Sequence, residues 1–189
     1  MNENVNSPVQ WLKYLLYAGI AALVNSFVGI FLPGKLSTWI GYAISAACVY
    51  LFFRLIVSNA RYKTAMIFSG AALIINLLGI QALSLAGSIC ALVGQYQEYH
   101  AHGELIQERD PRLAKKWGSL FWFQFAMSVI VVLLTGVLVG VLVAAGGLDA
   151  AVVTALATIV AAVLTLVLKV LYLVYLNRTV KLLETEFVV

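Results

Sequence analysis

The chain has 189 residues, of which 63% are hydrophobic and 11% are charged, and its formal net charge is +4. Its mean hydropathy is +0.99. The apolar runs are broken only by short polar gaps, which leaves no room for a soluble domain of useful size beside membrane helices. The basic excess is therefore interpreted as helix flanks that meet anionic lipid headgroups, and not as a nucleic-acid surface.

The apolar runs predict one all-α domain over residues 1–189, a polytopic transmembrane helix bundle with six spans. The first span covers about 9–32 and ends at the Pro33–Gly34 turn, a strong turn signal. The second covers about 36–57 and is followed by the short basic loop SNARYK. The lipid bilayer is thus the first expected partner of the chain.

Residues 64–94 are the difficult stretch, because a single helix of that length would measure about 46 Å. The hydrocarbon core of a bilayer is only about 30 Å thick. Two spans are therefore predicted, about 62–78 and 82–99, with a turn at 79–81 in which Gly79 adopts the left-handed conformation. A re-entrant hairpin with short third and fourth spans, or one long tilted helix, remains an alternative.

Residues 95–117 form the one substantial polar segment, which we expect to be a solvated cytoplasmic helix. Asp110 followed by Pro111 predicts a helix start, with aspartate as the cap and proline at the first helical position. The fifth span is then predicted at about 117–145 and the sixth at about 150–176, joined by the turn at 146–149.

The positions of lysine and arginine predict the topology. With six crossings, eleven of the twelve cations fall on one side of the membrane and only Lys35 falls on the other. Short loops rich in lysine and arginine stay in the cytoplasm, so both termini are predicted to be cytoplasmic. The chain is expected to be a multi-pass protein of a bacterial-type inner cell membrane. Tryptophans near helix ends, Trp117 among them, are expected at the headgroup level.

Uncharged polar residues in the outer third of the predicted spans are candidates for binding a small solute. Side-chain amides and hydroxyls in hydrocarbon are costly unless they pair between helices or face a cavity. Interhelical hydrogen bonds are the alternative explanation. The candidate ligand-binding residues are Asn25, Ser26, Asn76 and Gln81.

A second group of residues is predicted to contact lipid or the interface at the inner leaflet. Two of its cations lie deep within apolar runs, and their long side chains are expected to reach the inner headgroups. For Lys169, pairing with Glu98 is the alternative. The group comprises Arg54, Lys169, Arg61, Lys63, Lys115 and Lys116.

Two histidines and two glutamates cluster near residue 100, but helical geometry argues against a metal site. The pairs Glu98–His102 and His100–Glu104 lie about 200° apart around a helix axis. Nucleotide-binding and hydrolase motifs are absent, and Cys48 and Cys90 lack metal-ligand spacing. We therefore predict no catalytic residue, no metal ligand and no cofactor.

Small residues recur every four positions, as at Gly136, Gly140 and Ala144. Close approach through small side chains holds membrane helices together, so the fifth and sixth spans are predicted to pack tightly. Self-association through Gly136 and Gly140 is the alternative, and a partner membrane subunit is a further expectation.

The predicted function is non-enzymatic: binding or passing a small solute, or serving as the membrane subunit of a larger complex. The competing interpretation is a small enzyme that acts on lipid at the cytoplasmic interface through the 95–117 segment.

Overall fold

The computed structural model describes residues 7–29, 34–144 and 150–185, and in these ranges the chain is helical and contains no β-strand. The elements are α1 (Pro8–Val28), α2 (Gly34–Leu55), α3 (Arg61–Leu78), the short 3-10 helix η1 (Gln81–Leu83), α4 (Ser84–Ile106), α5 (Pro111–Ala144) and α6 (Ala150–Glu184). The predicted all-α architecture is confirmed.

Local sequence determines where several helices begin and end. The Ser7 hydroxyl accepts a hydrogen bond from the Gln10 backbone N–H at the start of α1. Gly79 ends α3 in the left-handed conformation, with φ 63° and ψ 18°. An Asp110 carboxylate oxygen accepts a hydrogen bond from the Leu113 N–H at 2.9 Å, which caps α5. The predicted turn at Gly79 and the predicted helix start at Pro111 are confirmed.

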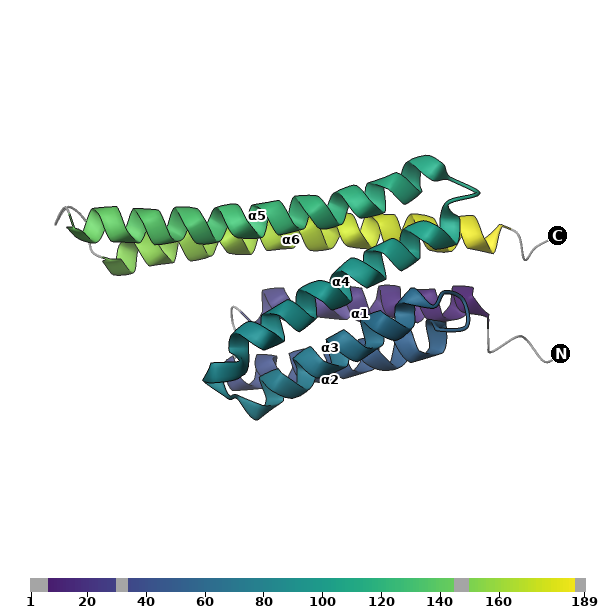
Figure 1. The fold of residues 1–189 in the computed structure, drawn as a ribbon, viewed down its shortest axis with the longest axis horizontal. Helices are drawn as coiled ribbons and strands as arrows, with labels where there is room; N and C mark the ends of the chain where they lie inside the picture. Colours follow the sequence, from purple (N-terminus) through teal and green to yellow (C-terminus); the bar gives the residue numbers. More distant parts are fainter. Residues whose placement is uncertain (1–6, 30–33, 145–149, 186–189) are drawn as a thin grey trace.

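The helices form a closed ring, because each packs against the next along the chain and α6 returns to α1. Figure 1 shows the α5–α6 hairpin on one side, α1 to α3 on the other, and α4 crossing between them. The start of α1 and the end of α6 lie at the same end, together with the α2–α3 and α4–α5 connections (Figure 1). We call this the terminal end of the bundle, and the end that carries the α3–α4 connection the far end.

Four helices are long and apolar enough to cross a membrane by length and composition: Pro8–Val28, Gly34–Leu55, Pro111–Leu133 and Thr158–Glu184. The outer surface of the bundle is rich in exposed large apolar side chains, as a lipid-facing surface requires. The chain is therefore a membrane protein with four candidate spanning helices. The other two helices, α3 and α4, do not meet the same criterion, so the number of crossings predicted from the sequence belongs to the proposals below.

The tightest helix contact that glycine permits differs from the predicted one. Gly136 and Gly140 are exposed, and among the described atoms none lies within 4 Å of a Cβ added at either position, so the described residues place no close helix approach at these two glycines. At Gly94 a Cβ would lie 2.6 Å from the Ser69 hydroxyl oxygen and 3.2 Å from the Ser69 backbone nitrogen. A close approach of helix backbones is thus found between α3 and α4, whereas the face of α5 that carries Gly136 and Gly140 is exposed.

Candidate functional site

One face of α4 is buried because small residues recur along it every seventh position. Gly87 and Gly94 are buried, and Ala101 is fully buried. This spacing keeps one face against α3 over three turns and more. Glu98 lies one turn beyond Gly94, and His102 one turn beyond Glu98, so both side chains enter the bundle.

The burial of this segment corrects the expectation of a solvated helix over 95–117. His102 is fully buried and Glu98 is only 9% exposed. The helix continues unbroken through Gly103, where a Cβ would lie 3.1 Å from the Ala114 carbonyl oxygen of α5. Trp117 is also fully buried, so it is a core residue and not a headgroup anchor. Its indole N–H donates to the Thr179 hydroxyl at 3.1 Å.

Glu98 and His102 lie between two tyrosines from other helices. The Tyr172 hydroxyl of α6 donates to Glu98 Oε1 at 2.5 Å. The Tyr62 hydroxyl of α3 lies 2.7 Å from His102 Nδ1. This contact engages Nδ1 and leaves Nε2 facing Glu98 Oε1 at 3.6 Å, which is too long for a hydrogen bond. His102 Nε2 is a buried nitrogen without a hydrogen-bond partner, so the predicted Glu98–His102 pair is present as a buried contact and not as a surface hydrogen bond.

A cavity of about 500 Å³ lies inside the helix ring, and Glu98 lines it. Side chains from α1 to α6 contribute to its wall. Such a volume falls in the range of small-molecule sites in proteins. The polar or charged side chains that line the cavity are Tyr42, Ser45, Ser69, Asn76, Gln95, Glu98, Tyr99, Gln124, Ser128, Thr165, Lys169 and Tyr172.

A chain of hydrogen bonds fixes one wall of the cavity. The Tyr99 hydroxyl donates to the Gln124 amide oxygen at 2.9 Å. The Gln124 amide nitrogen in turn donates to the Gln95 amide oxygen at 3.2 Å. The ring of Tyr99 is stacked on that of Tyr172, with centroids 5.5 Å apart. These contacts hold polar side chains of α4, α5 and α6 in defined positions.

The direction of the Lys169 side chain differs from the expected one. Its ammonium donates to the Ser26 hydroxyl near the end of α1, at 2.7 Å, instead of extending along α6 toward Arg178. Side chains on a helix tilt toward the helix N-terminus, and the N-terminus of α6 lies away from the terminal end. The ammonium therefore points toward the far end, and Lys169 lines the cavity.

The four candidate solute-binding residues do not come together. Asn76 lines the cavity, and Ser26 reaches it indirectly through Lys169. The Asn25 amide donates to the Ser37 carbonyl at 3.1 Å, which closes the α1–α2 hairpin. Gln81 is exposed in η1. From the sequence, Glu98 is expected only as an alternative partner for Lys169, and Gln95 and Gln124 are not among the candidates.

The predicted interface cations lie around the terminal end. The Arg54 guanidinium stacks over the Trp11 ring at 4.4 Å. Exposed cations lie near the starts of α3 and α5, namely Lys63, Lys115 and Lys116. Arg61 Nε donates to Glu104 Oε1 at 2.6 Å. The structure holds no lipid, so the roles of these five cations at the membrane are proposals.

Glu104 ties the α2–α3 connection to α4. The Asn59 amide donates to Glu104 Oε2 at 3.0 Å. Partial burial opposes ionisation of Glu104, but the hydrogen bonds from Asn59 and Arg61 and the Arg61 charge hold the pKa of this carboxyl below its ordinary value. The contact is a surface clamp between two cytoplasm-facing segments of the predicted topology.

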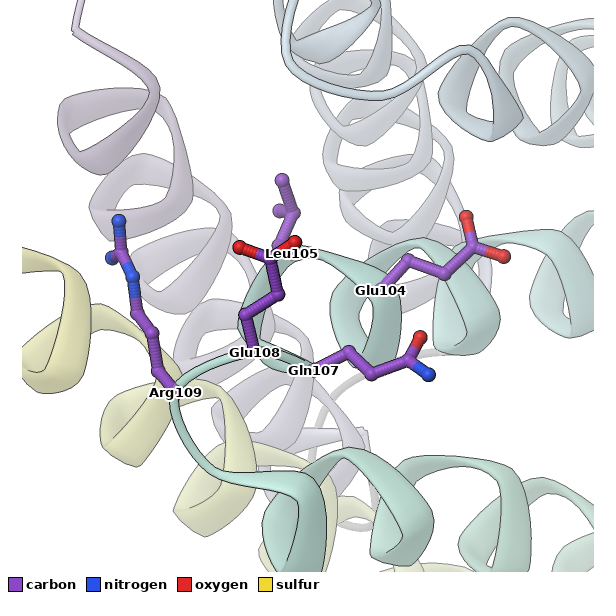
Figure 2. Close-up of a pocket in the computed structure, with 5 residues that line it drawn as sticks. All are labelled: Glu104, Leu105, Gln107, Glu108 and Arg109. Carbon is purple, nitrogen blue, oxygen red and sulfur yellow. The ribbon is translucent and has the colours of Figure 1, made fainter.

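A second hollow, of about 400 Å³, lies where α4 ends, and it is lined by five residues, Glu104, Leu105, Gln107, Glu108 and Arg109. Figure 2 shows Glu104 on one side of this hollow and Arg109 on the other. These charged groups do not converge on a common point (Figure 2). Over residues 7–29, 34–144 and 150–185, no group of three His, Cys, Asp or Glu side chains could hold a metal ion.

Comparisons with protein families, with curated proteins and with solved structures found no match to this chain.

Proposed function

We propose that this membrane protein binds a small polar solute in the cavity inside its helix ring and catalyses no reaction. The observation that carries the proposal is the lining of the cavity, where five helices contribute polar side chains. Polar groups within a membrane are costly, and they mark solute pathways when they face an enclosed space.

The same observation supports six crossings, with the terminal end in the cytoplasm of a bacterial-type inner membrane. Both α3 and α4 line the cavity with polar side chains, which are tolerated in a membrane when they face a cavity or neighbouring helices. This explains why these two helices are less apolar than the four candidate spans, while each still exposes large apolar side chains such as Ile74 and Leu85. The cations near the starts of α3 and α5 favour the cytoplasmic side for that end.

The enzyme interpretation depended on the 95–117 segment, with a metal at His100 or His102 as its sign. His102 is buried in the bundle, whereas His100 is half-buried and lines a hollow together with Glu104 and Lys115. The hollow at the end of α4 supplies only Glu104, Glu108 and Arg109 as charged groups. A role as a membrane subunit remains compatible with solute binding.

Native mass spectrometry of protein released from mild detergent tests the proposal. We expect a small non-covalent adduct, and we expect Ser45→Phe to lose it, because Ser45 lines the cavity and a phenyl ring would occupy that space. Ala46→Phe is the matched control, since Ala46 is the next residue on α2, is exposed and does not line the cavity. An adduct retained equally in both variants, or none in the wild type at any solute concentration, would refute solute binding here. A partner protein in the spectrum would instead favour the subunit role.

A further inference from the structure

Two opposite charges face the same cavity without forming an ion pair with each other. Glu98 and Lys169 both line it. Glu98 Oε1 accepts a hydrogen bond from the Tyr172 hydroxyl, with His102 Nε2 farther away at 3.6 Å. The Lys169 ammonium donates to the Ser26 hydroxyl. Among the ion pairs of the described residues, none joins Glu98 to Lys169.

An ionised group inside a membrane bundle is costly unless an opposite charge compensates it. A ligand with one charge would compensate one of these groups and approach the other with a charge of like sign. A ligand that carries both charges compensates both groups at once. We propose, on the basis of the solute-binding function above, that the cavity binds a zwitterion, with its cationic end at Glu98 and its anionic end at Lys169.

The geometry restricts the separation of the two charges in the ligand. Lys169 precedes Tyr172, the partner of Glu98, by three residues, which is about 4.5 Å along the axis of α6. The lysine side chain extends further in the same direction, toward Ser26. A zwitterion whose charges are separated by several bonds is therefore favoured over one in which they sit on adjacent atoms.

Aromatic surface beside Glu98 supplies further recognition for the cationic end. Tyr99 and Tyr172 both line the cavity, and their rings stack on each other, which covers one face of each ring. Aromatic faces attract ammonium groups, and the attraction grows when water is excluded. The amine end of the zwitterion therefore belongs at this end of the cavity.

Zwitterionic chemistry has two sources in a membrane: a free solute, or the headgroup of a phospholipid such as phosphatidylethanolamine. Thermal unfolding in detergent with added solutes tests the first. Native mass spectrometry from nanodiscs of phosphatidylethanolamine, compared with nanodiscs of phosphatidylglycerol alone, tests the second. Retention of the ethanolamine lipid alone would assign the site to the headgroup.

The decisive probes are γ-aminobutyrate, butylamine and butyrate, which share a four-carbon chain and differ in charge. The series from β-alanine to 6-aminohexanoate then varies the charge separation. We expect the best-fitting zwitterion to bind at least tenfold more tightly than the amine or the acid of equal length. Glu98→Gln should reduce the affinity for the zwitterion to the affinity that the wild type has for the acid of equal length. Lys169→Met should reduce it to the affinity that the wild type has for the amine. Lys115→Met, outside the cavity, should change nothing.

Equal affinity for the three probes, or no binding by any zwitterion in solution or in lipid, would overturn this inference. Solute binding itself would still stand if the Ser45→Phe variant lost an adduct of another charge class. If Glu98→Gln does not fold, the Lys169→Met variant tests the inference by itself. Ser26, the hydrogen-bond partner of Lys169, is exposed, and the contacts of Glu98 with Tyr172 and His102 do not involve Lys169.

Discussion

At the terminal end of the bundle, side chains from all six helices pack against one another, whereas toward the far end the same helices expose most of their apolar side chains. Trp117 is fully buried and lies 5.5 Å from the rings of both Tyr99 and Tyr172. Val132 and Val137, further along the same helix, are 70% and 61% exposed. The packed end supplies contacts that lipid cannot replace, and the exposed segments rely on lipid as their solvent.

This difference predicts that the same substitution destabilises the protein by very different amounts at two positions of α5. Trp117→Ala should lower the free energy of unfolding by about 3–5 kcal/mol, because it empties a fully buried site and leaves Thr179 without its indole partner. Trp122→Ala, at a site that is 58% exposed, should cost much less. Reversible unfolding of the two variants in mixed micelles measures both values, and equal losses would contradict the comparison.

Leucine substitutions at two glycines sharpen the contrast between α4 and α5. Gly94→Leu should destabilise the protein by about 3 kcal/mol or more, because its side chain would overlap Ser69 of α3. Gly140→Leu should be tolerated in the monomer, since no described atom lies within 4 Å of an added Cβ there. Light scattering on the Gly140→Leu variant also tests self-association, which this substitution would abolish if that glycine forms a dimer contact.

Loss of one hydroxyl should disturb the interior of the packed end. Tyr62→Phe removes the partner of His102 Nδ1 and leaves both ring nitrogens of a buried histidine unpaired, at a cost of about 1–3 kcal/mol. Tyr42→Phe is the matched control, because its hydroxyl donates to the Asn76 carbonyl at 3.2 Å in a partly exposed site. A difference of zero between the two thermal midpoints would show that the Tyr62–His102 contact contributes nothing.

The surface clamp at Glu104 should give the smallest effect, and it depends on pH. The folded-state pKa of Glu104 lies below its unfolded value of about 4.5, so its contribution is complete above that pH and is lost as the pH falls through the folded pKa. For an exposed pair this amounts to about 0.2–1 kcal/mol. Stability should therefore decrease less steeply below pH 4.5 in Glu104→Gln than in the wild type, and identical acid profiles would exclude the clamp.

The helix ends were predictable because they depend on short-range chemistry. Gly79 ends α3, and the Asp110–Pro111 pair starts α5, through backbone conformations that each sequence favours locally. The burial of Glu98 and His102 was not predicted, since it depends on how α4 is rotated against α3 and α6. The seven-residue spacing of Gly87, Gly94 and Ala101 was the sequence signal for a buried face of α4. The high polar content of residues 95–117 favoured a solvated helix instead.

The contacts of Gly140 and Lys169 differ from the expected ones. A small-residue pattern shows where helices are able to approach, but not which neighbour they approach: Gly140 is exposed, whereas an added Cβ at Gly94 would meet Ser69. The direction of Lys169 follows from the tilt of side chains toward the helix N-terminus, which the predicted direction of the sixth span already implied. The turn at 146–149 lies outside the described residues, so the prediction made for it stays a prediction.

The proposed solute site depends most on α3 and α4 crossing the membrane, because only then does the cavity inside the helix ring lie at membrane depth. Labelling of single cysteines with an impermeant maleimide in intact cells and in inverted vesicles measures this directly. We predict that residues 35 and 81 react only from outside and that residues 61, 110 and 181 react only from the cytoplasmic side. Labelling of residue 81 from the cytoplasmic side, or of residues 61 and 110 from opposite sides, would contradict the six-crossing ring.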